Sequence, residues 1–257
     1  CRHSTNHRQE KTNRAMIHTI LWAIYFILYL IIVSPMRAYY AHQIKKGNRE
    51  KVQAGVERMV HNWAHRLLWM AGAKVIVDGK ENIPQGTAVF VANHQSNFDI
   101  PVVLACVGQP RALMAKVSLA KIPGLRSWMD LLQCVYVDRE DEKQAVRALM
   151  DATRLVKSGV SMTIFPEGTR SKGGPVKEFK GGAFRAATSA KVPVVPVTID
   201  GSFHLLEERY RIHSGTVHVT IHKPIETAGM SRQEVRELPE RVREEVLSVM
   251  DDAYRGA

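Results

Sequence analysis

The chain has 257 residues, enough for one large domain with a substantial core and an additional segment. Its three cysteines form neither an even framework nor a Cys-x-x-Cys pair, which argues against a disulfide-stabilised fold and structural zinc and favours a reducing compartment. The formal net charge is +11, but residues 1–73 hold eleven Lys/Arg and three Glu, a net of +8, which leaves +3 for residues 74–257. This distribution favours contact between the first segment and an anionic membrane surface, and it argues against nucleic-acid binding by the second.

The first predicted element is an apolar helix over residues 15–36. These 22 residues carry no formal charge and are long enough to cross a hydrocarbon layer of about 30 Å. No small-residue cleavage site follows them, which argues against a cleaved signal peptide. Basic residues lie on both sides of the run, so their distribution gives no orientation in a membrane.

The second predicted element is an amphipathic helix over residues 51–70. Its apolar face repeats at helical spacing and comprises Val52, Val56, Met59, Val60, Trp63, Leu67 and Met70. His61 and His65 fall on the polar face without an evident third ligand, so we expect no metal there. We expect residues 1–73 to form a membrane anchor in which the two helices make a hairpin within one leaflet; a single membrane span is the alternative.

Residues 74–257 alternate between strand and helix patterns. Strands are predicted over residues 74–78, 86–92, 111–115, 134–137, 161–165, 192–199 and 216–221. Helices are predicted over residues 99–107, 119–132 with an interruption at 123–124, 140–158, 181–190, and after 231. We therefore expect an α/β domain with a largely parallel, mixed sheet flanked by helices.

Three details of this pattern are open to a structural test. The prolines in residues 192–199 predict an edge or irregular strand. The capping box Ser231-x-x-Glu234 starts a C-terminal helix that Pro239 is expected to divide or restart. The helix over residues 140–158 is predicted to bury a stripe made of Val146, Leu149, Met150, Thr153 and Val156.

A candidate site follows the predicted strand that ends near Val91. The polar turn after this strand carries His94, and a helix opens near Asp99, with Pro101 in its first turn. At this spacing the Asp99 carboxylate can accept the His94 Nδ1–H and leave Nε2 to take a proton. No Gly-x-Ser-x-Gly elbow occurs in the chain, so the nucleophile is expected to be a hydroxyl of the substrate. A lone His-x4-Asp is a weak signal, because helix capping explains most such pairs.

Three further segments in a fixed order strengthen the signal. Asn93-His-Gln-Ser-Asn-Phe-Asp99 is followed by Lys116-x-x-Leu119-x-x-Ile-Pro123, Phe165-Pro-Glu-Gly-Thr-Arg-Ser171 and Val192-Pro-Val-Val-Pro196. Together they resemble the four motifs of the glycerolipid acyltransferases, with most similarity to the 1-acylglycerol-3-phosphate acyltransferases. The resemblance covers about residues 74–225, and the first and third motifs are highly specific. The second departs from the usual pattern, with Ser118 where Glu is common and Gly124 directly after Pro123.

The resemblance implies acyl transfer from a thioester, either acyl-CoA or acyl carrier protein, to the free hydroxyl of lysophosphatidate, which gives phosphatidate. It assigns His94 as general base and Asp99 as the residue that orients it. Substrate binding then falls to Lys116, Glu167, Gly168, Thr169 and Arg170. No metal or other cofactor is implied, and a bacterial member is expected on the cytoplasmic face of the inner membrane.

The chemistry of these residue types leaves several roles open. The planar fork of Arg170 suits a phosphate, and Lys116 supplies a second positive charge; a surface salt bridge and a solvated strand end are the bland alternatives. Glu167 is expected to bind a glycerol hydroxyl or to order its loop. The oxyanion donors are expected near Gly168 or at the start of the Asp99 helix. Residues 192–197 either line an acyl channel or form ordinary core.

Rival functions share parts of this pattern. The same chemistry on glycerol 3-phosphate, a lyso-aminolipid or another lysophospholipid is the nearest rival, because the second motif departs from the usual one. A noncatalytic lipid-binding protein and a thioesterase with water as acceptor are the others. The intact pair of His94 and Asp99 argues against the noncatalytic protein.

Overall fold

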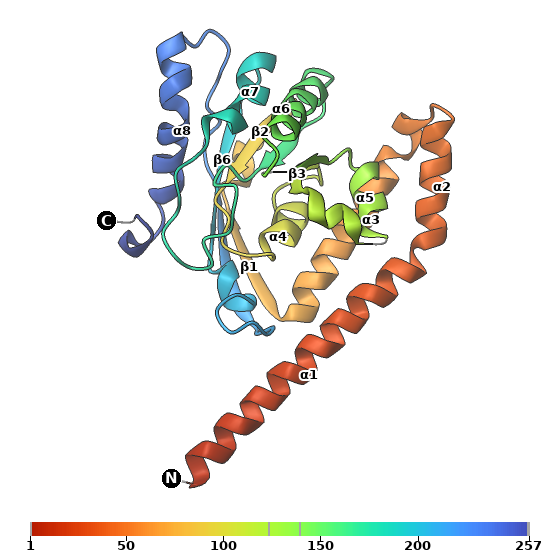
Figure 1. Ribbon diagram of the computed structural model, residues 1–257, viewed down its shortest axis with the longest axis vertical. Helices are drawn as coiled ribbons and strands as arrows, with labels where there is room; N and C mark the ends of the chain where they lie inside the picture. Colours follow the sequence, from red (N-terminus) through yellow and green to blue (C-terminus); the bar gives the residue numbers. More distant parts are fainter. Residues whose placement is uncertain (1, 123, 139, 256–257) are drawn as a thin grey trace.

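A seven-stranded sheet lies at the centre of the molecule (Figure 1). The computed structural model describes residues 2–122, 124–138 and 140–255, with side chains from residue 13 onward. The strands are β1 (Ala73–Asp78), β2 (Val89–Ala92), β3 (Ala112–Lys116), β4 (Val135–Val137), β5 (Met162–Ile164), β6 (Val194–Asp200) and β7 (Gly215–Ile221). Their order is β1-β7-β6-β2-β5-β3-β4, and every pairing is parallel except the antiparallel β6–β7 pair. The expected mixed, largely parallel sheet is confirmed.

Helices cover both faces of this sheet. The α-helices are α1 (Arg2–Ile32), α2 (Ser34–Lys45), α3 (Arg49–Ala71), α4 (Asp99–Cys106), α5 (Leu125–Leu131), α6 (Glu142–Lys157), α7 (Arg185–Ala190) and α8 (Arg232–Leu247). Short 3-10 turns are η1 (Lys80–Asn82), η2 (Val117–Lys121), η3 (Gly181–Phe184), η4 (Ser202–Leu205) and η5 (Asp252–Tyr254). Buried residues of α3, α4 and α5 share one hydrophobic cluster, and those of α6, α7 and α8 share another. The fold is a three-layer α/β arrangement.

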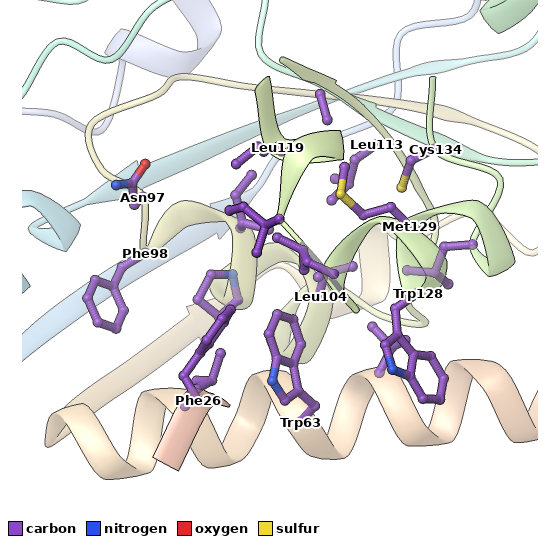
Figure 2. Close-up of a pocket in the computed structure, with 18 of the residues that line it drawn as sticks. Phe26, Trp63, Asn97, Phe98, Leu104, Leu113, Leu119, Trp128, Met129 and Cys134 are labelled. Carbon is purple, nitrogen blue, oxygen red and sulfur yellow. The ribbon is translucent and has the colours of Figure 1, made fainter. Parts of the chain in front are cut away.

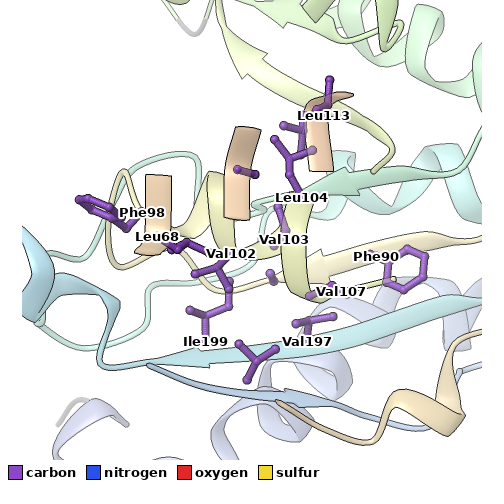
Figure 3. Packing of buried hydrophobic residues seen from close by; sticks show 14 of the residues in the cluster. Leu68, Phe90, Phe98, Val102, Val103, Leu104, Val107, Leu113, Val197 and Ile199 are labelled. Atoms are coloured by element: carbon purple, nitrogen blue, oxygen red, sulfur yellow. The ribbon is translucent and has the colours of Figure 1, made fainter. Parts of the chain in front are cut away.

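Strand β2 shows how the sequence builds these two cores. Its alternate residues Val89 and Val91 belong to the cluster under α6 and α8, whereas Phe90 and Ala92 belong to the cluster under α4. This is the period of two that a strand imposes on its side chains. All four residues are buried, as expected for a strand with helices on both faces. Figure 3 shows the α4 side, where Val102 and its neighbours pack toward β6.

The amphipathic helix α3 differs from its expected place in a membrane interface. Its apolar face packs against α4 and β1, and the buried residues are Val52, Val56, Val60, Ala64, Leu67, Leu68 and Ala71. Protein therefore covers the face that we expected lipid to cover. An amphipathic pattern indicates only that one face is buried, and it does not identify what buries it.

The apolar helix α1 packs on α3 along one side only. Trp22 donates from Nε1 to the carbonyl of Leu67, and Phe26 stacks at an angle on Trp63. The other side of α1 is exposed and apolar, with Met16, Ile17, Ile20, Leu21, Ile24, Ile27, Leu28, Ile31 and Ile32. By length and composition, residues Asn13–Ile32 are apolar enough to cross a membrane. The helix ends at Ile32, earlier than predicted, and α2 starts a new direction with Pro35 in its first turn.

Strand β6 corrects the expectation of an edge strand. It lies between β2 and β7, and its fully buried pattern includes Pro196. The Pro196 carbonyl accepts the N–H of His222, which follows the last residue of β7. The Pro196 nitrogen faces the same side of β6 as its carbonyl, which is the side of β7. The β6–β7 ladder ends at Ile221, so the N–H that proline lacks is not needed there, and the pairing of β6 with β2 on the other side is intact.

Two helices also differ in detail from the prediction. In α6 the buried residues are Ala148, Ala152 and Val156, whereas Val146 and Met150 are 52% and 61% exposed. Small alanines allow α7 to approach closely, so the helix presents them inward and leaves larger apolar side chains outside. Helix α8 begins with the predicted capping box but continues through Pro239. Its buried residues Leu238, Val242, Val246 and Leu247 anchor it on both sides of the proline.

Candidate active site

The candidate site lies at the carboxyl end of β2. The side chain of Asn93 exchanges two hydrogen bonds of 2.8 Å with the backbone of Ile199, which extends the pairing of β2 with β6 by one residue. The chain then turns and enters α4 at Asp99. The structure brings His94 and Asp99 together, with 2.7 Å between Nδ1 and Oδ2, as their spacing predicts.

Asp99 is a fully buried carboxylate surrounded by donors. Besides His94, its Oδ2 accepts the backbone N–H groups of Gln95 at 2.7 Å and Ser96 at 2.8 Å, and its Oδ1 accepts the hydroxyl of Ser202 at 2.5 Å. In this arrangement the carboxylate is the acceptor of every hydrogen bond, so it accepts the Nδ1–H of His94. The imidazole is therefore held in the tautomer that leaves the Nε2 lone pair available. The His94 side chain is 14% exposed.

The turn over residues 165–171 closes over the imidazole. The ring of Phe165 stacks on that of His94, with 4.3 Å between centroids. The N–H of Ser171 donates to the carbonyl of His94 at 2.7 Å, and that of Lys172 donates to the carbonyl of Gln95 at 3.2 Å. The first and third motifs, which are far apart in the sequence, thus form one backbone-paired unit.

Glu167 lies inside this unit. Its Oε1 accepts the N–H of His94 at 2.6 Å and its Oε2 accepts the N–H of Lys177 at 3.0 Å. Burial raises the pKa of its carboxyl, against the lowering effect of these two hydrogen bonds. Both oxygens are engaged with backbone, so the structure favours loop ordering over a hydroxyl contact for Glu167.

Arg170 projects from the same turn and pairs with an acid that the motifs did not contain. Its Nη1 donates to Glu207 Oε1 at 2.8 Å. The Glu207 side chain is 3% exposed, whereas that of Arg170 is 32% exposed. The pair is therefore not a solvated surface salt bridge. About a third of the Arg170 side chain is exposed, next to the turn that carries His94.

The remaining predicted binding residues are distributed around this centre. Lys116 is exposed at the last residue of β3. Thr169 is exposed, and its hydroxyl accepts from Lys177 Nζ at 2.7 Å. Gly168 has a φ of +77°, which suits glycine, but its N–H donates to the carbonyl of Phe165 at 3.2 Å. The Gly168 N–H is therefore already used, and so are those at the start of α4.

An apolar cavity of about 320 Å³ begins at the turn that carries His94 (Figure 2). Asn97 and Phe98 line one end, and Met129 and Cys134 lie toward the other. Its walls come from α1, α3, α4, α5, β3 and η2. Burial raises the pKa of the Cys134 thiol to about 12, so this group lines the cavity uncharged. Residues 192–197 are absent from the lining, and Val194, Val195 and Val197 belong to the cores, so of the two expected roles the structure supports ordinary core and not an acyl channel.

Within residues 2–122, 124–138 and 140–255, no group of three or more His, Cys, Asp or Glu is arranged to hold a metal ion. His61 and His65 lie with 6.2 Å between their rings. His222 is buried and hydrogen-bonds to Thr198 and Glu245, so it is part of the packing between β6 and α8.

Comparison with known proteins adds an independent finding. A family model described as Acyltransferase matches residues 74–200. The 1-acyl-sn-glycerol-3-phosphate acyltransferase of Borreliella burgdorferi is 30% identical over 186 residues, which is 72% of this chain and 74% of that protein. The Escherichia coli enzyme of the same name is 34% identical over 154 residues, 60% of this chain and 62% of that protein.

A further relative and a solved structure are also similar to this chain. A probable 1-acyl-sn-glycerol-3-phosphate acyltransferase of Mycoplasma pneumoniae is 32% identical over 62% of this chain, and the match spans 62% of that protein's length. Among solved structures, the 1-acyl-sn-glycerophosphate acyltransferase PlsC of Thermotoga maritima aligns with a TM-score of 0.75 at 30% identity. That alignment covers 93% of this chain and 99% of that one.

Proposed function

Because the chain belongs to the acyltransferase family, we propose that it transfers a fatty acyl group from a thioester to the free hydroxyl of lysophosphatidate and so makes phosphatidate. The relatives carry names that specify this acceptor. Acyl-CoA or acyl carrier protein is the proposed donor. The observation that carries the proposal is the His94–Asp99 pair, with Nε2 of His94 unengaged within the described residues.

The proposed mechanism follows from this geometry. His94 Nε2 takes the proton of the acceptor hydroxyl as its oxygen attacks the thioester carbonyl. Asp99 stabilises the imidazolium that results. The tetrahedral intermediate then collapses with cleavage of the carbon–sulfur bond, and the imidazolium returns the proton to the departing thiolate. The N–H groups of Thr169 and Arg170 are the proposed oxyanion donors, since those of Gly168, Gln95 and Ser96 are already bonded.

The acceptor phosphate is assigned to Arg170, whose planar fork keeps donors free beside its bond to Glu207. Lys116 adds a second positive charge from the end of β3. Glu167 and Gly168 shape the turn that presents these groups. This assignment favours an acceptor that carries a phosphate and argues against water as acceptor.

We assign the donor's acyl chain to the apolar cavity. It starts beside the turn that bears the base, and its lining is almost entirely apolar, as a hydrocarbon chain requires. Phe98 at its mouth packs against Trp22 of α1, so the cavity wall and the exposed face of α1 are neighbours. The acyl chain is therefore proposed to enter the cavity from the lipid side beside Phe98, which follows His94 by four residues.

The exposed face of α1 is the proposed membrane contact. One side of the helix is occupied by α3, which favours a helix lying within one leaflet over a helix that spans the bilayer. Residues 1–73 then divide. Helices α1 and α2 are proposed to meet lipid, whereas α3 packs as part of the acyltransferase domain, which otherwise comprises residues 74–257. In a bacterium we propose this contact on the cytoplasmic face of the inner membrane, the side on which the thioester donors are found.

The test is acyl transfer by purified protein in detergent, with labelled acyl-CoA or acyl carrier protein and a panel of acceptors. We expect phosphatidate from lysophosphatidate and little free fatty acid. Transfer only to another lysolipid or to glycerol 3-phosphate would change the acceptor and keep the chemistry. Rapid thioester hydrolysis without an acceptor would indicate a thioesterase. No reaction with either donor would favour the noncatalytic lipid-binding protein.

A further inference from the structure

Two buried polar side chains reach the site from the loop that joins β6 to β7, residues 201–214. Ser202 is fully buried, and the side chain of Glu207 is 3% exposed. The family model ends at residue 200, just before this loop, and none of the four sequence motifs includes it. The loop therefore supplies contacts that the motifs do not describe.

Ser202 contacts the acid that orients the base. Its hydroxyl donates to Asp99 Oδ1, the oxygen that His94 does not use. The other three donors all meet Oδ2. Ser202 is therefore the single side chain that fixes the second oxygen, and so the rotation of the carboxylate, within the described hydrogen bonds.

Glu207 joins the base-bearing turn to the arginine. Its Oε1 accepts both Arg170 Nη1 at 2.8 Å and the Asn97 N–H at 2.9 Å, and its Oε2 accepts the Ser96 hydroxyl at 2.5 Å. Ser96 and Asn97 follow His94 by two and three residues. One carboxylate thus sets the distance between the guanidinium and the imidazole.

The buried charge of Glu207 fits a positioning role. A negative group beside an arginine that binds phosphate weakens the electrostatic attraction for that phosphate, and burying a carboxylate is unfavourable without partners. The bonds of Glu207 to Arg170, Ser96 and Asn97 offset these two costs, because they hold the guanidinium in one orientation before substrate binds. A preorganised guanidinium loses less freedom on binding.

The loop itself is held firmly at both ends. Gly201 has a φ of +86°, and an added Cβ would lie 2.6 Å from the Thr216 carbonyl, so only glycine fits there. Its N–H donates to Gln95 Oε1 at 3.0 Å. Farther along, Leu205 is fully buried, and the N–H of Ile212 donates to Thr19 of α1 at 2.9 Å.

We propose that Ser202 and Glu207 are positioning residues: Ser202 aligns the Asp99–His94 pair, and Glu207 holds Arg170 at a set distance from it. The inference rests on the proposed function, since it assigns the two ends of the loop to the base and to the phosphate of the acceptor. It predicts that the two residues affect different kinetic constants.

The test compares Ser202→Ala and Glu207→Gln with the matched control Glu208→Gln, whose parent side chain is exposed and pairs with His204. Ser202→Ala is expected to lower kcat roughly tenfold, the effect of losing one hydrogen bond to a charged group, with KM for lysophosphatidate nearly unchanged. The acidic limb of its pH–rate profile should move to higher pH, because an Asp99 with one donor fewer holds the proton on His94 more strongly. A merely structural serine would not move that limb.

Glu207→Gln is expected to raise KM for lysophosphatidate roughly tenfold, with a smaller change in kcat. It should have little effect on residual transfer to monoacylglycerol, an acceptor without phosphate. In an Arg170→Gln background, Glu207→Gln should change KM no further, because it acts through that arginine. If Glu207→Gln does not fold, Glu207→Asp, which draws the carboxylate back by one methylene, provides the same comparison.

The outcomes separate two kinds of failure. If the wild type does not acylate lysophosphatidate, the proposed function is wrong. If the wild type is active and Glu207→Gln matches Glu208→Gln, or lowers transfer to both acceptors equally, the positioning role of Glu207 is wrong. If the acidic limb of the pH–rate profile does not move in Ser202→Ala, the positioning role of Ser202 is wrong.

Discussion

The His94 turn and the apolar cavity beside it are built on different principles. In the turn every position is determined by directional bonds, with four donors on Asp99 and three on Glu207. In the cavity the walls are side chains from six elements that share shape and apolarity and make few polar contacts. The turn is suited to chemistry, which needs fixed angles, and the cavity to selecting a chain by its length.

This difference predicts separable effects of substitution. A change in the turn should alter the rate for every acyl chain alike. A change in the cavity wall should alter the ranking of chains and leave the proton transfer intact.

The largest effect is expected from His94→Ala. Loss of a general base typically lowers a rate by about 10²–10⁴-fold, and we expect kcat to fall within that range. Asp99 keeps three other donors in this variant, so we expect the protein to fold, and its thermal midpoint is measured alongside. The measurement is initial rate of phosphatidate formation, with His65→Ala, an exposed histidine of α3, as the control. A variant with more than a tenth of wild-type kcat would remove His94 from the mechanism.

The second effect concerns Arg170→Lys. Lysine keeps the charge but loses the planar fork and the bond geometry to Glu207, so KM for lysophosphatidate should rise roughly 10–100-fold. The control is Arg154→Lys on the exposed face of α6. An unchanged KM would show that phosphate binds elsewhere.

The third effect tests the cavity. Ala115 is a small lining residue on β3, and Ala115→Leu would occupy the space of a few methylenes. At about 0.8 kcal/mol for each buried methylene, the loss of space for about two to three methylenes should increase discrimination against the longest chains roughly 15- to 60-fold relative to shorter ones. The measurement is kcat/KM across a series of acyl-CoA lengths, with Ala54→Leu on the exposed side of α3 as the control. Equal loss for all lengths would contradict a role of this cavity in chain binding.

The smallest effect concerns the pH dependence of stability at Glu167. Burial raises the pKa of this carboxyl in the folded protein, so the folded state holds its proton more tightly than the unfolded state does. Its contribution to stability is therefore present below the ordinary glutamate pKa of about 4.5 and is lost as pH rises through the raised value. The free energy of unfolding of wild type relative to Glu167→Gln should fall across that window. A difference that is constant or grows with pH would contradict this account.

Sequence alone predicted the strand and helix order well because each element carries a local signal. The β-branched runs, the Ser231 capping box and the turn between His94 and Asp99 all involve residues close in the chain. The pairing of His94 with Asp99 was predictable for the same reason. The predictions that differ from the structure concern elements whose local sequence pattern is compatible with two different environments.

Helix α3 is such a case, since a face buried against α4 and a face buried in lipid have the same periodicity. Helix α6 is another, because alanines were the residues that allowed close packing while Met150 remained exposed. Ser202 and Glu207 carried no signal at all. Their partners Asp99 and Arg170 lie 103 and 37 residues away, and Glu207 sits in a charged run that resembles a solvated surface.

The most direct test of separate roles combines both regions in one experiment. Single-turnover transfer rates would be measured across acyl lengths for wild type, Asp99→Asn, Ala115→Leu and the double variant. We expect Asp99→Asn to lower the rate by the same factor at every length, and the two changes to add on a logarithmic scale in the double variant. A chain-length preference that changes in Asp99→Asn, or that Ala115→Leu no longer alters in the double variant, would contradict the account.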